Sequence, residues 1–219
     1  MLLKNILNKF RKQKEYGQLL EWINKYNREN IYQLEHLPII EYLHIGGDFE
    51  LDFVPKEIEY CQNLKELSFD KNNISEVPST IANIKKLKTL IFKDMPLKEV
   101  PLWVFELEDL EYLTFGRTDI TELPKEIGKL KKLKYLNLYT SKLKTLPDEL
   151  CECENLEILS IFGSEVEVLP ECLGKLKKLY TLNTEYSNLK KLPDSLDKAQ
   201  LTNEKTFFDI NSINGEMMP

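Results

Sequence analysis

The amino-acid sequence predicts an α/β repeat solenoid, in which similar units stack side by side around one continuous core. Six consecutive segments of 23 residues fill residues 54–191 without a gap. Each segment begins with Val-Pro or Leu-Pro, and within it the spacing of apolar residues changes from three to two. A spacing of three is typical of a helical turn, and a spacing of two is typical of a strand. Because one such unit cannot bury its own apolar edge, the repeats are expected to stack and to form a parallel sheet.

The N-terminal segment, residues 1–30, is expected to form a helical cap. Apolar residues share one helical face within 2–10 and again within 19–26, and Gly17 is expected to separate two helices. Such a cap would cover the first unit, whose apolar edge is otherwise exposed. A second interpretation is a helix that lies on a membrane surface, because basic residues are frequent in this segment. They are Lys4, Lys9, Arg11, Lys12 and Lys14.

The solenoid itself is expected to span residues 31–201. A degenerate unit precedes the regular repeats, and its Gly46-Gly47-Asp48 stretch is expected to shift the register by about one residue. The apolar residues of this unit are Leu34, Leu37, Ile40, Leu43 and Ile45. Residues 202–219 leave the pattern and are expected to form a C-terminal cap and tail. The candidates to cover the last unit are Phe207, Phe208 and Ile210.

The fourth repeat, LPKEIGKLKKLKYLNLYTSKLKT, is the clearest copy. Ile127, Leu130 and Leu133 predict a short helical turn, and Leu136 and Leu138 predict the strand that follows. This pattern resembles the leucine-rich-repeat family, in particular its LPxxIxxLxxLxxLxLxxNxL type, which occurs in bacterial proteins and in intracellular Ras-group proteins. The resemblance implies a right-handed curved solenoid. Its parallel sheet would line the concave side, and short helical or irregular segments would form the convex side.

One position departs from the family pattern. The family usually has Asn where the chain turns away from the strand, whereas only Asn72 keeps it here. Ser and Thr hydroxyls bond backbone groups locally with fewer donors than an amide, and Met95 cannot take that role. A less uniform ladder is therefore expected, with a local defect around residues 94–97. The other copies carry Thr118, Ser141, Ser164 and Ser187.

Composition and charge argue against several classes of protein. The formal net charge of −6 argues against a general nucleic-acid binder, which needs a basic face. No stretch approaches about 18 uncharged apolar residues, so no transmembrane helix is expected. Lys4, Asn5 and Asn8 interrupt the first apolar residues, so no secretion signal is expected and a reducing cytoplasm is the predicted location. The four cysteines do not suggest a disulfide framework.

No catalytic, cofactor or metal site is predicted. The sequence has no P-loop, no GxSxG serine elbow and no HExxH motif. His36 and His44 lack an accompanying ligand pattern. Cys153 occupies a position that is Leu in neighbouring repeats and is interpreted as a core residue. For Cys151 and Cys172, near the convex surface of adjacent units, packing or an exposed thiol is favoured over metal or redox chemistry.

Charged pairs just before the predicted strands alternate in sign along the solenoid. Lys131-Lys132, for example, lies between Glu108-Asp109 and Glu154-Asn155. Stacked units would place unlike charges side by side, which favours a role in setting the register over a basic docking stripe. Each exposed contact is expected to contribute about 0–1 kcal/mol.

The concave side of the predicted sheet is the expected partner-binding face. Side chains that alternate with the core leucines point to this side, and large apolar or aromatic ones gather in the middle and later repeats. Such side chains are favoured anchors in protein interfaces. The alternative is that they only pack against one another across the strands. The predicted partner-binding residues are Tyr112, Tyr135, Tyr139, Ile158 and Phe162.

A second candidate interface lies on the convex side, where Trp103 and Phe105 replace Glu126 and Gly128 of the next repeat. Packing beneath a neighbouring turn is the alternative for this pair. With no catalytic machinery in view, the sequence favours a non-catalytic cytoplasmic module that binds another protein on its concave face. The alternative function is a membrane-surface scaffold attached through the basic N-terminal helix.

Overall fold

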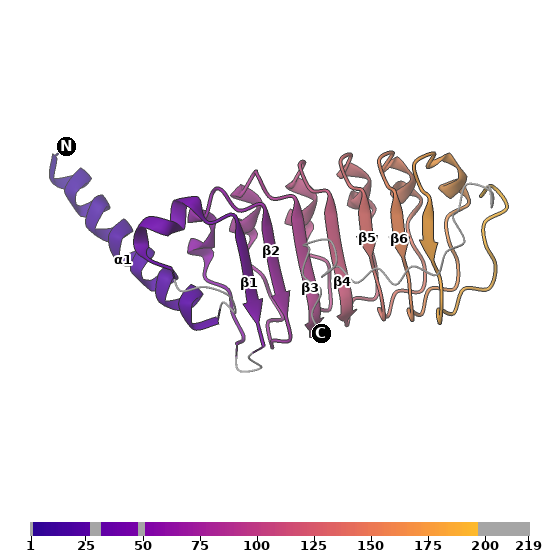
Figure 1. Ribbon diagram of the computed structural model, residues 1–219, viewed down its shortest axis with the longest axis horizontal. Helices are drawn as coiled ribbons and strands as arrows, with labels where there is room; N and C mark the ends of the chain where they lie inside the picture. The colour runs from indigo at the N-terminus through magenta and orange to yellow at the C-terminus, as the bar shows by residue number, and fades with distance from the viewer. Residues whose placement is uncertain (1, 27–31, 48–50, 197–219) are drawn as a thin grey trace.

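A computed structural model of the protein describes residues 2–26, 32–47 and 51–196. In this part of the chain, seven parallel strands form one open sheet in chain order (Figure 1). The strands are β1 (Tyr42–Gly46), β2 (Glu66–Asp70), β3 (Thr89–Met95), β4 (Tyr112–Thr118), β5 (Tyr135–Asn137), β6 (Ile158–Ser160) and β7 (Thr181–Asn183). The predicted α/β repeat solenoid is confirmed. The predicted C-terminal cap with Phe207, Phe208 and Ile210 lies outside the described residues.

The register of the sheet follows the sequence repeat. Tyr112 pairs with Tyr135, and Tyr135 pairs with Ile158, so each strand position meets the residue 23 places along the chain. Tyr42 pairs instead with Glu66, 24 places along. The one-residue shift that was expected for the first unit is therefore confirmed.

Each unit carries a short 3-10 helix on the side opposite the sheet, at the predicted helical turn. In the fourth repeat the N–H of Ile127 donates to Pro124 O, that of Leu130 to Ile127 O, and that of Leu133 to Leu130 O. Hydrogen bonds between residues three apart define the 3-10 form, so the three-residue apolar spacing matches the helix that forms. These helices are η1 (Leu34–Ile39), η2 (Lys56–Tyr60), η3 (Ser79–Asn83), η4 (Leu102–Glu106), η5 (Lys125–Lys129), η6 (Asp148–Glu152) and η7 (Glu171–Lys175).

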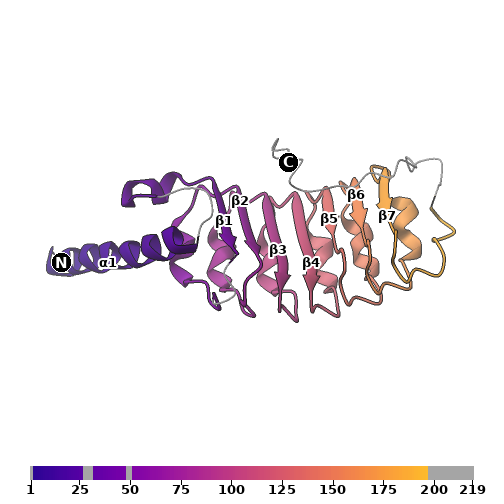
Figure 2. The ribbon, with the colours of Figure 1, turned by 60° about the horizontal axis from the view of Figure 1, so that its bottom comes forward.

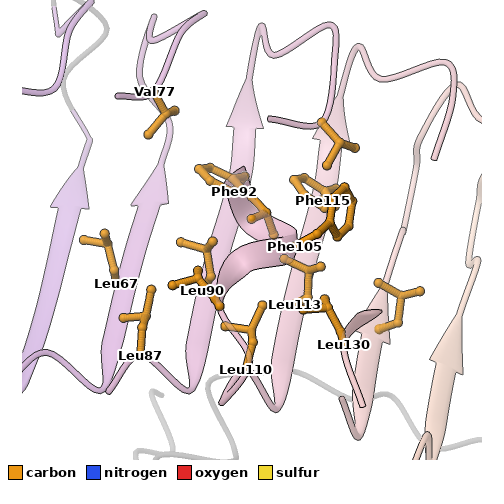
Figure 3. Packing of buried hydrophobic residues seen from close by; sticks show 14 of the residues in the cluster. Leu67, Val77, Leu87, Leu90, Phe92, Phe105, Leu110, Leu113, Phe115 and Leu130 are labelled. Carbon is orange, nitrogen blue, oxygen red and sulfur yellow. The ribbon is translucent and has the colours of Figure 1, made fainter. Parts of the chain in front are cut away.

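The core lies between the sheet and the 3-10 helices and runs the length of the solenoid. The largest of its fully buried side chains are Phe69, Phe92 and Phe115, which stack on consecutive strands with ring centroids 5.8 and 5.3 Å apart. Figure 3 shows Phe92 and Phe115 among the surrounding leucines. Cys61 and Cys153 are fully buried among these apolar side chains, as a core position predicts. Stacking identical positions of neighbouring units thus gives each unit the apolar cover that it lacks alone.

The N-terminal cap is a single helix, α1 (Leu2–Tyr26). The expected break at Gly17 is wrong, because the helix continues through this glycine. Leu19 and Ile23 are buried against the first units, and the Tyr60 hydroxyl of η2 donates a 2.8 Å hydrogen bond to Glu15. The beginning of α1 projects beyond the first strand (Figure 2). One mid-helix glycine costs about 1 kcal/mol relative to alanine, which the packing at the C-terminal half of the helix outweighs.

Every unit has one residue in the left-handed backbone region, near the end of its strand or shortly after it. In five units this residue is not glycine, with φ between 49° and 57°. They are Lys71, Asp94, Arg117, Thr140 and Tyr186. The expected defect around 94–97 is wrong: β3 continues to Met95, which is buried and pairs with Thr118. The residue with positive φ that turns the chain is therefore the one before the Asn position. The Asn position itself can hold a buried apolar side chain, as Met95 shows.

The expectation that the four cysteines form no disulfide is also wrong. Cys151 of η6 and Cys172 of η7 are joined by a disulfide, with Cα atoms 5.9 Å apart. They occupy different positions of their repeats, and the offset brings the two side chains together across adjacent units. Because disulfides persist in oxidising surroundings, this pairing removes the cysteine-based reason for predicting a reducing compartment.

Ion pairs connect neighbouring units on the side of the 3-10 helices, as the alternating charges predict. Lys132 pairs with Asp109 at 2.5 Å, and Lys131 pairs with Glu152 at 2.9 Å. Both lysines are largely exposed, so each pair contributes little to stability. The pairs favour the observed register without determining it.

Candidate partner-binding site

The solvent-facing side of the sheet, called the open face below, corresponds to the concave side of the sequence prediction. On β4 the core residues Leu113 and Phe115 alternate with Tyr112, Thr114 and Gly116, which belong to the open face. The same alternation recurs in register on the following strands. Aromatic side chains on and next to β4 to β7 consequently fall into two groups, one at each end of the strands.

The first group, Tyr112, Tyr135 and Tyr180, is called the tyrosine cluster. The rings of Tyr112 and Tyr135 stack with centroids 4.3 Å apart and an interplanar angle of 9°. Side-chain interactions with Tyr180 and Tyr112 are among the smaller causes that affect the pKa of Tyr135. Burial is the main cause that raises the pKa of all three tyrosines. At neutral pH the cluster therefore presents protonated hydroxyls and ring faces.

Ile158 lies on β6. This strand is between β5, which begins with Tyr135, and β7, which Tyr180 precedes. The exposed fraction of Ile158 is 4%, whereas Tyr180 is 38% exposed. Ile158 pairs with Tyr135 of β5 on one side and with Thr181 of β7 on the other. Ile158 is therefore almost inaccessible to a partner, which would contact the tyrosines instead.

The second group, Tyr139, Phe162 and Tyr186, is called the outer aromatic cluster. Phe162 and Tyr186 meet edge to face with centroids 5.2 Å apart, and Tyr186 is 81% exposed. The ring of Tyr139 lies over Gly116, where a Cβ atom would be 1.8 Å from the ring. The Arg117 guanidinium lies 5.8 Å from the centre of the same ring. Glycine at 116 is therefore what lets Tyr139 lie flat on the sheet.

A row of small polar side chains separates the two clusters. Asn137 accepts a hydrogen bond from the N–H of Tyr139 at 3.2 Å, and Asn183 accepts one from the N–H of Glu185 at 3.1 Å. These bonds fix the backbone just after the short strands β5 and β7. They hold the residues of the outer aromatic cluster in place although the regular strands have ended.

A ladder of charges borders the tyrosine cluster, one residue before each strand. The Glu111 carboxylate pairs with Lys88 at 2.9 Å and with Lys134 at 2.6 Å. The hydrogen bonds from Lys134 and Lys88 lower the pKa of Glu111. Glu157 occupies the next step of the ladder and Tyr180 the step after it.

The structure brings four of the five predicted partner-binding residues to the accessible surface of the open face. Tyr112 and Tyr135 lie in one cluster, and Tyr139 and Phe162 lie in the other. Tyr180 was missed because it occupies a position that is charged in most repeats. The sequence does contain a signal for Tyr180: the equivalent positions of the preceding units, from Glu41 to Glu157, carry charged residues, and Tyr180 is aromatic.

Trp103 and Phe105, the second candidate interface, lie on η4 in the core. Their exposed fractions are 8% and 3%, and the indole N–H of Trp103 donates to Val77 O at 3.2 Å. These contacts correspond to packing beneath a neighbouring turn, the alternative that the sequence left open. The exposed apolar side chain of η4 is instead Leu102, with 62% of its surface accessible.

Metal ligation and membrane crossing can be assessed in the part of the chain that the structure describes. No group of three or more His, Cys, Asp or Glu side chains there is arranged to hold a metal ion. Among the described helices, none is long and apolar enough to cross a membrane. Lys12 and Lys14 of the predicted basic helix face are exposed on α1.

Comparisons with known proteins identify the repeat. A family model described as a leucine-rich repeat region matches residues 103–188, and one described as a Leucine Rich Repeat matches residues 63–84. No curated protein matches the sequence of the chain.

Solved structures share the fold at low sequence identity. A leucine-rich-repeat protein of Leptospira interrogans has a TM-score of 0.58 and 24% identity, over 78% of this chain and 55% of its own. The leucine-rich-repeat domain of the type III effector XopL has a TM-score of 0.59 and 19% identity, over 82% and 69%. The ectodomain of the receptor kinase GASSHO1/SCHENGEN3 from Arabidopsis thaliana has a TM-score of 0.55 and 24% identity, over 68% and 19%. The chain thus spans about half the length of the Leptospira protein.

Proposed function

Because the chain belongs to the leucine-rich-repeat family, we propose that it is a non-catalytic module that binds a protein partner on the open face of its sheet. The observation that carries this proposal is the placement of two aromatic clusters on one face of the sheet, where Tyr180 is 38% and Tyr186 is 81% exposed. Exposed aromatic groups are costly on a monomer unless another surface covers them.

The chemistry of the clusters suits protein recognition. Tyrosine combines a large apolar ring with a hydroxyl that tolerates water, so it serves as an interface anchor without destabilising the free protein. Ring stacking holds Tyr112 and Tyr135, and contact with Gly116 holds Tyr139. Little side-chain entropy would be lost on binding, because the rings are already restrained.

The scaffold supports the same role. Parallel strands in constant register hold both clusters on one rigid surface, which lets a partner contact several units at once. The solved structure of the GASSHO1/SCHENGEN3 ectodomain is a complex with CASPARIAN STRIP INTEGRITY FACTOR 2. For the present chain, that precedent supports a protein or peptide partner without naming one.

The proposal is tested by comparing capture of partners from a native extract by three purified proteins. The first is the wild type, and the second is Tyr135→Ala/Phe162→Ala, which truncates one ring in each cluster. The third, Leu102→Ala/Val168→Ala, is the matched control, because both of its side chains are exposed and apolar but lie elsewhere. Circular dichroism and thermal unfolding establish that all three proteins are folded.

The expected result is a partner that the wild type and the control retain and the open-face variant loses. Truncating two anchors should lower affinity at least about a hundredfold, since anchor residues each contribute about 2 kcal/mol or more. Equal capture by all three folded proteins would contradict binding on the open face. Loss confined to the control would instead assign the interface to the side of Leu102.

A further inference from the structure

The charge ladder beside the tyrosine cluster ends without compensation. Glu111 is shared by Lys88 and Lys134, at 2.9 and 2.6 Å. Glu157 is the next carboxylate, and it forms no ion pair with any described residue. A lysine at position 180 would continue the alternation, but that position is a tyrosine. Among the described residues, Glu157 therefore has no cation on the side of Tyr180, and Lys134 on its other side is paired with Glu111 at 2.6 Å.

Glu157 belongs to the same surface as the tyrosine cluster. Its backbone carbonyl accepts hydrogen bonds from the N–H groups of Tyr180 and Thr181, which fixes the unit beside β7. After burial, the nearby negative charge of Glu157 is among the causes that raise the pKa of Tyr112, Tyr135 and Tyr180. A carboxylate thus lies within electrostatic reach of three tyrosines, two of which stack on each other.

The outer aromatic cluster repeats this combination. Glu185 is exposed and aligned with Phe162, since the N–H of Gly163 donates to Glu185 O at 2.8 Å. Like Glu157, it forms no ion pair with the described residues. By contrast, the Arg117 cation beside Tyr139 already pairs with Asp94 at 3.3 Å. The uncompensated charge on the face from β5 to β7 is therefore negative.

We propose that the protein partner of the open face inserts an arginine or lysine side chain between Glu157 and the tyrosine cluster, where it supplies the missing cation of the ladder. This inference rests on the proposed function and specifies the chemistry of the partner. A guanidinium fits best, because it bonds a carboxylate through two N–H groups and stacks on an aromatic ring at the same time. The partner surface is accordingly basic, complementary to a chain with a net charge of −6.

Synthetic peptides test the inference without knowledge of the natural partner. The probe is an octapeptide of alternating glycine and arginine, and the matched control replaces each arginine with citrulline, which has a similar shape and no charge. Tyrosine ring signals in NMR spectra report where the peptide binds. The arginine peptide should shift the signals of Tyr112, Tyr135 and Tyr180, and the citrulline peptide should not.

Two pairs of variants separate the specific site from general attraction between opposite charges. Glu157→Gln and Glu154→Gln remove the same charge from the same repeat, but Glu154 is exposed at the turn before the strand. Glu157→Gln should weaken arginine-peptide binding about tenfold, and Glu154→Gln should leave it within about twofold. Tyr180→Lys completes the ladder within the chain and should abolish the ring shifts, whereas Tyr180→Gln should only weaken them.

Several results would overturn the inference. They are equal binding of the arginine and citrulline peptides, equal losses in Glu157→Gln and Glu154→Gln, and absence of tyrosine shifts at any peptide concentration. A folded protein that keeps a partner through its open face but gives one of these results would refute the cation site alone. If the open-face variant loses no partner, the proposed function fails, whatever the peptides show.

Discussion

Cys151 and Cys172 form a disulfide that ties η6 to η7, and the two residues are 21 apart in the chain. A cross-link of this span stabilises a protein by about 3 kcal/mol in the chain-entropy model, since it restricts the unfolded chain. We therefore expect the double variant Cys151→Ser/Cys172→Ser to unfold at a lower urea concentration than the oxidised wild type. Urea titration followed by circular dichroism measures the difference.

The other two cysteines do not complicate a reduction experiment with dithiothreitol. Burial raises the pKa of Cys61 and Cys153 to about 12, so they remain unreactive thiols in the folded protein. Dithiothreitol should accordingly lower the stability of the wild type to that of the double variant and leave the variant unchanged. An identical unfolding midpoint for oxidised and reduced wild type would show that the disulfide does not form or does not stabilise the fold.

Tyr60 attaches α1 to the first regular unit, through its hydrogen bond to Glu15 and its edge-to-face contact with Tyr16 at 4.7 Å. The hydrogen bond to Glu15 is the largest of the causes that raise the pKa of Tyr60 to about 12, from 10.0. A raised pKa means that the hydroxyl stabilises the fold fully below pH 10 and loses that contribution as the pH rises to 12. Tyr60→Phe should therefore cost about 1.5 kcal/mol of unfolding free energy near neutral pH.

The pH dependence separates this hydrogen bond from simple packing. The difference in unfolding free energy between wild type and Tyr60→Phe should disappear between pH 10 and 12, because the wild type then loses the same bond. Urea titrations at several pH values measure it. A difference that stays constant over this range would assign the effect of the substitution to packing against Tyr16.

Thr140 leaves β5 with a φ of 52°, a backbone conformation that β-branched residues rarely adopt. Asparagine tolerates this region better, so Thr140→Asn should raise the free energy of unfolding by up to about 1 kcal/mol. Thr121→Asn is the control, since Thr121 is also exposed but does not have a positive φ. Thermal unfolding of both variants checks this expectation, which equal shifts in the two variants would contradict.

The repeat made most of the fold predictable, because one spacing rule is tested six times over the same chain. Val54 to Lys191 contains the six copies, and the register of 23 residues between Tyr112 and Tyr135 follows directly. Gly17 was misread because helix propensity is a local quantity, whereas Leu19 and Ile23 hold the helix through tertiary contacts. Met95 was misread because the side chain at one position was taken to control a turn that the preceding residue makes.

The sequence predicted which side chains lie on the open face, but it did not predict which of them contact one another. Alternation along a strand places Tyr112 and Tyr139 on the open face whatever their neighbours are. It says nothing about contacts between units, such as those that leave Ile158 with an exposed fraction of 4%. The pairing of Cys151 with Cys172 was hidden for the same reason, since the two residues occupy different positions of their repeats.

Gly116 controls the position of the Tyr139 ring and so offers a test of the outer aromatic cluster that leaves its members intact. In Gly116→Ala the new Cβ would lie 1.8 Å from Cε1 of Tyr139, so the ring must move away from the sheet. The clash involves the far end of a half-exposed side chain, so the cost in unfolding free energy should stay near the lower end of the usual range for overpacking, about 1 kcal/mol. The contact between Tyr139 and Arg117 should be lost, and the ring signals of Tyr139 should shift in NMR spectra.

Gly17→Ala is the matched control, because no atom lies within 4 Å of its new Cβ. If a partner uses the outer cluster, Gly116→Ala will weaken its binding while Gly17→Ala will not; unchanged ring signals in Gly116→Ala would show that Tyr139 does not lie over the glycine.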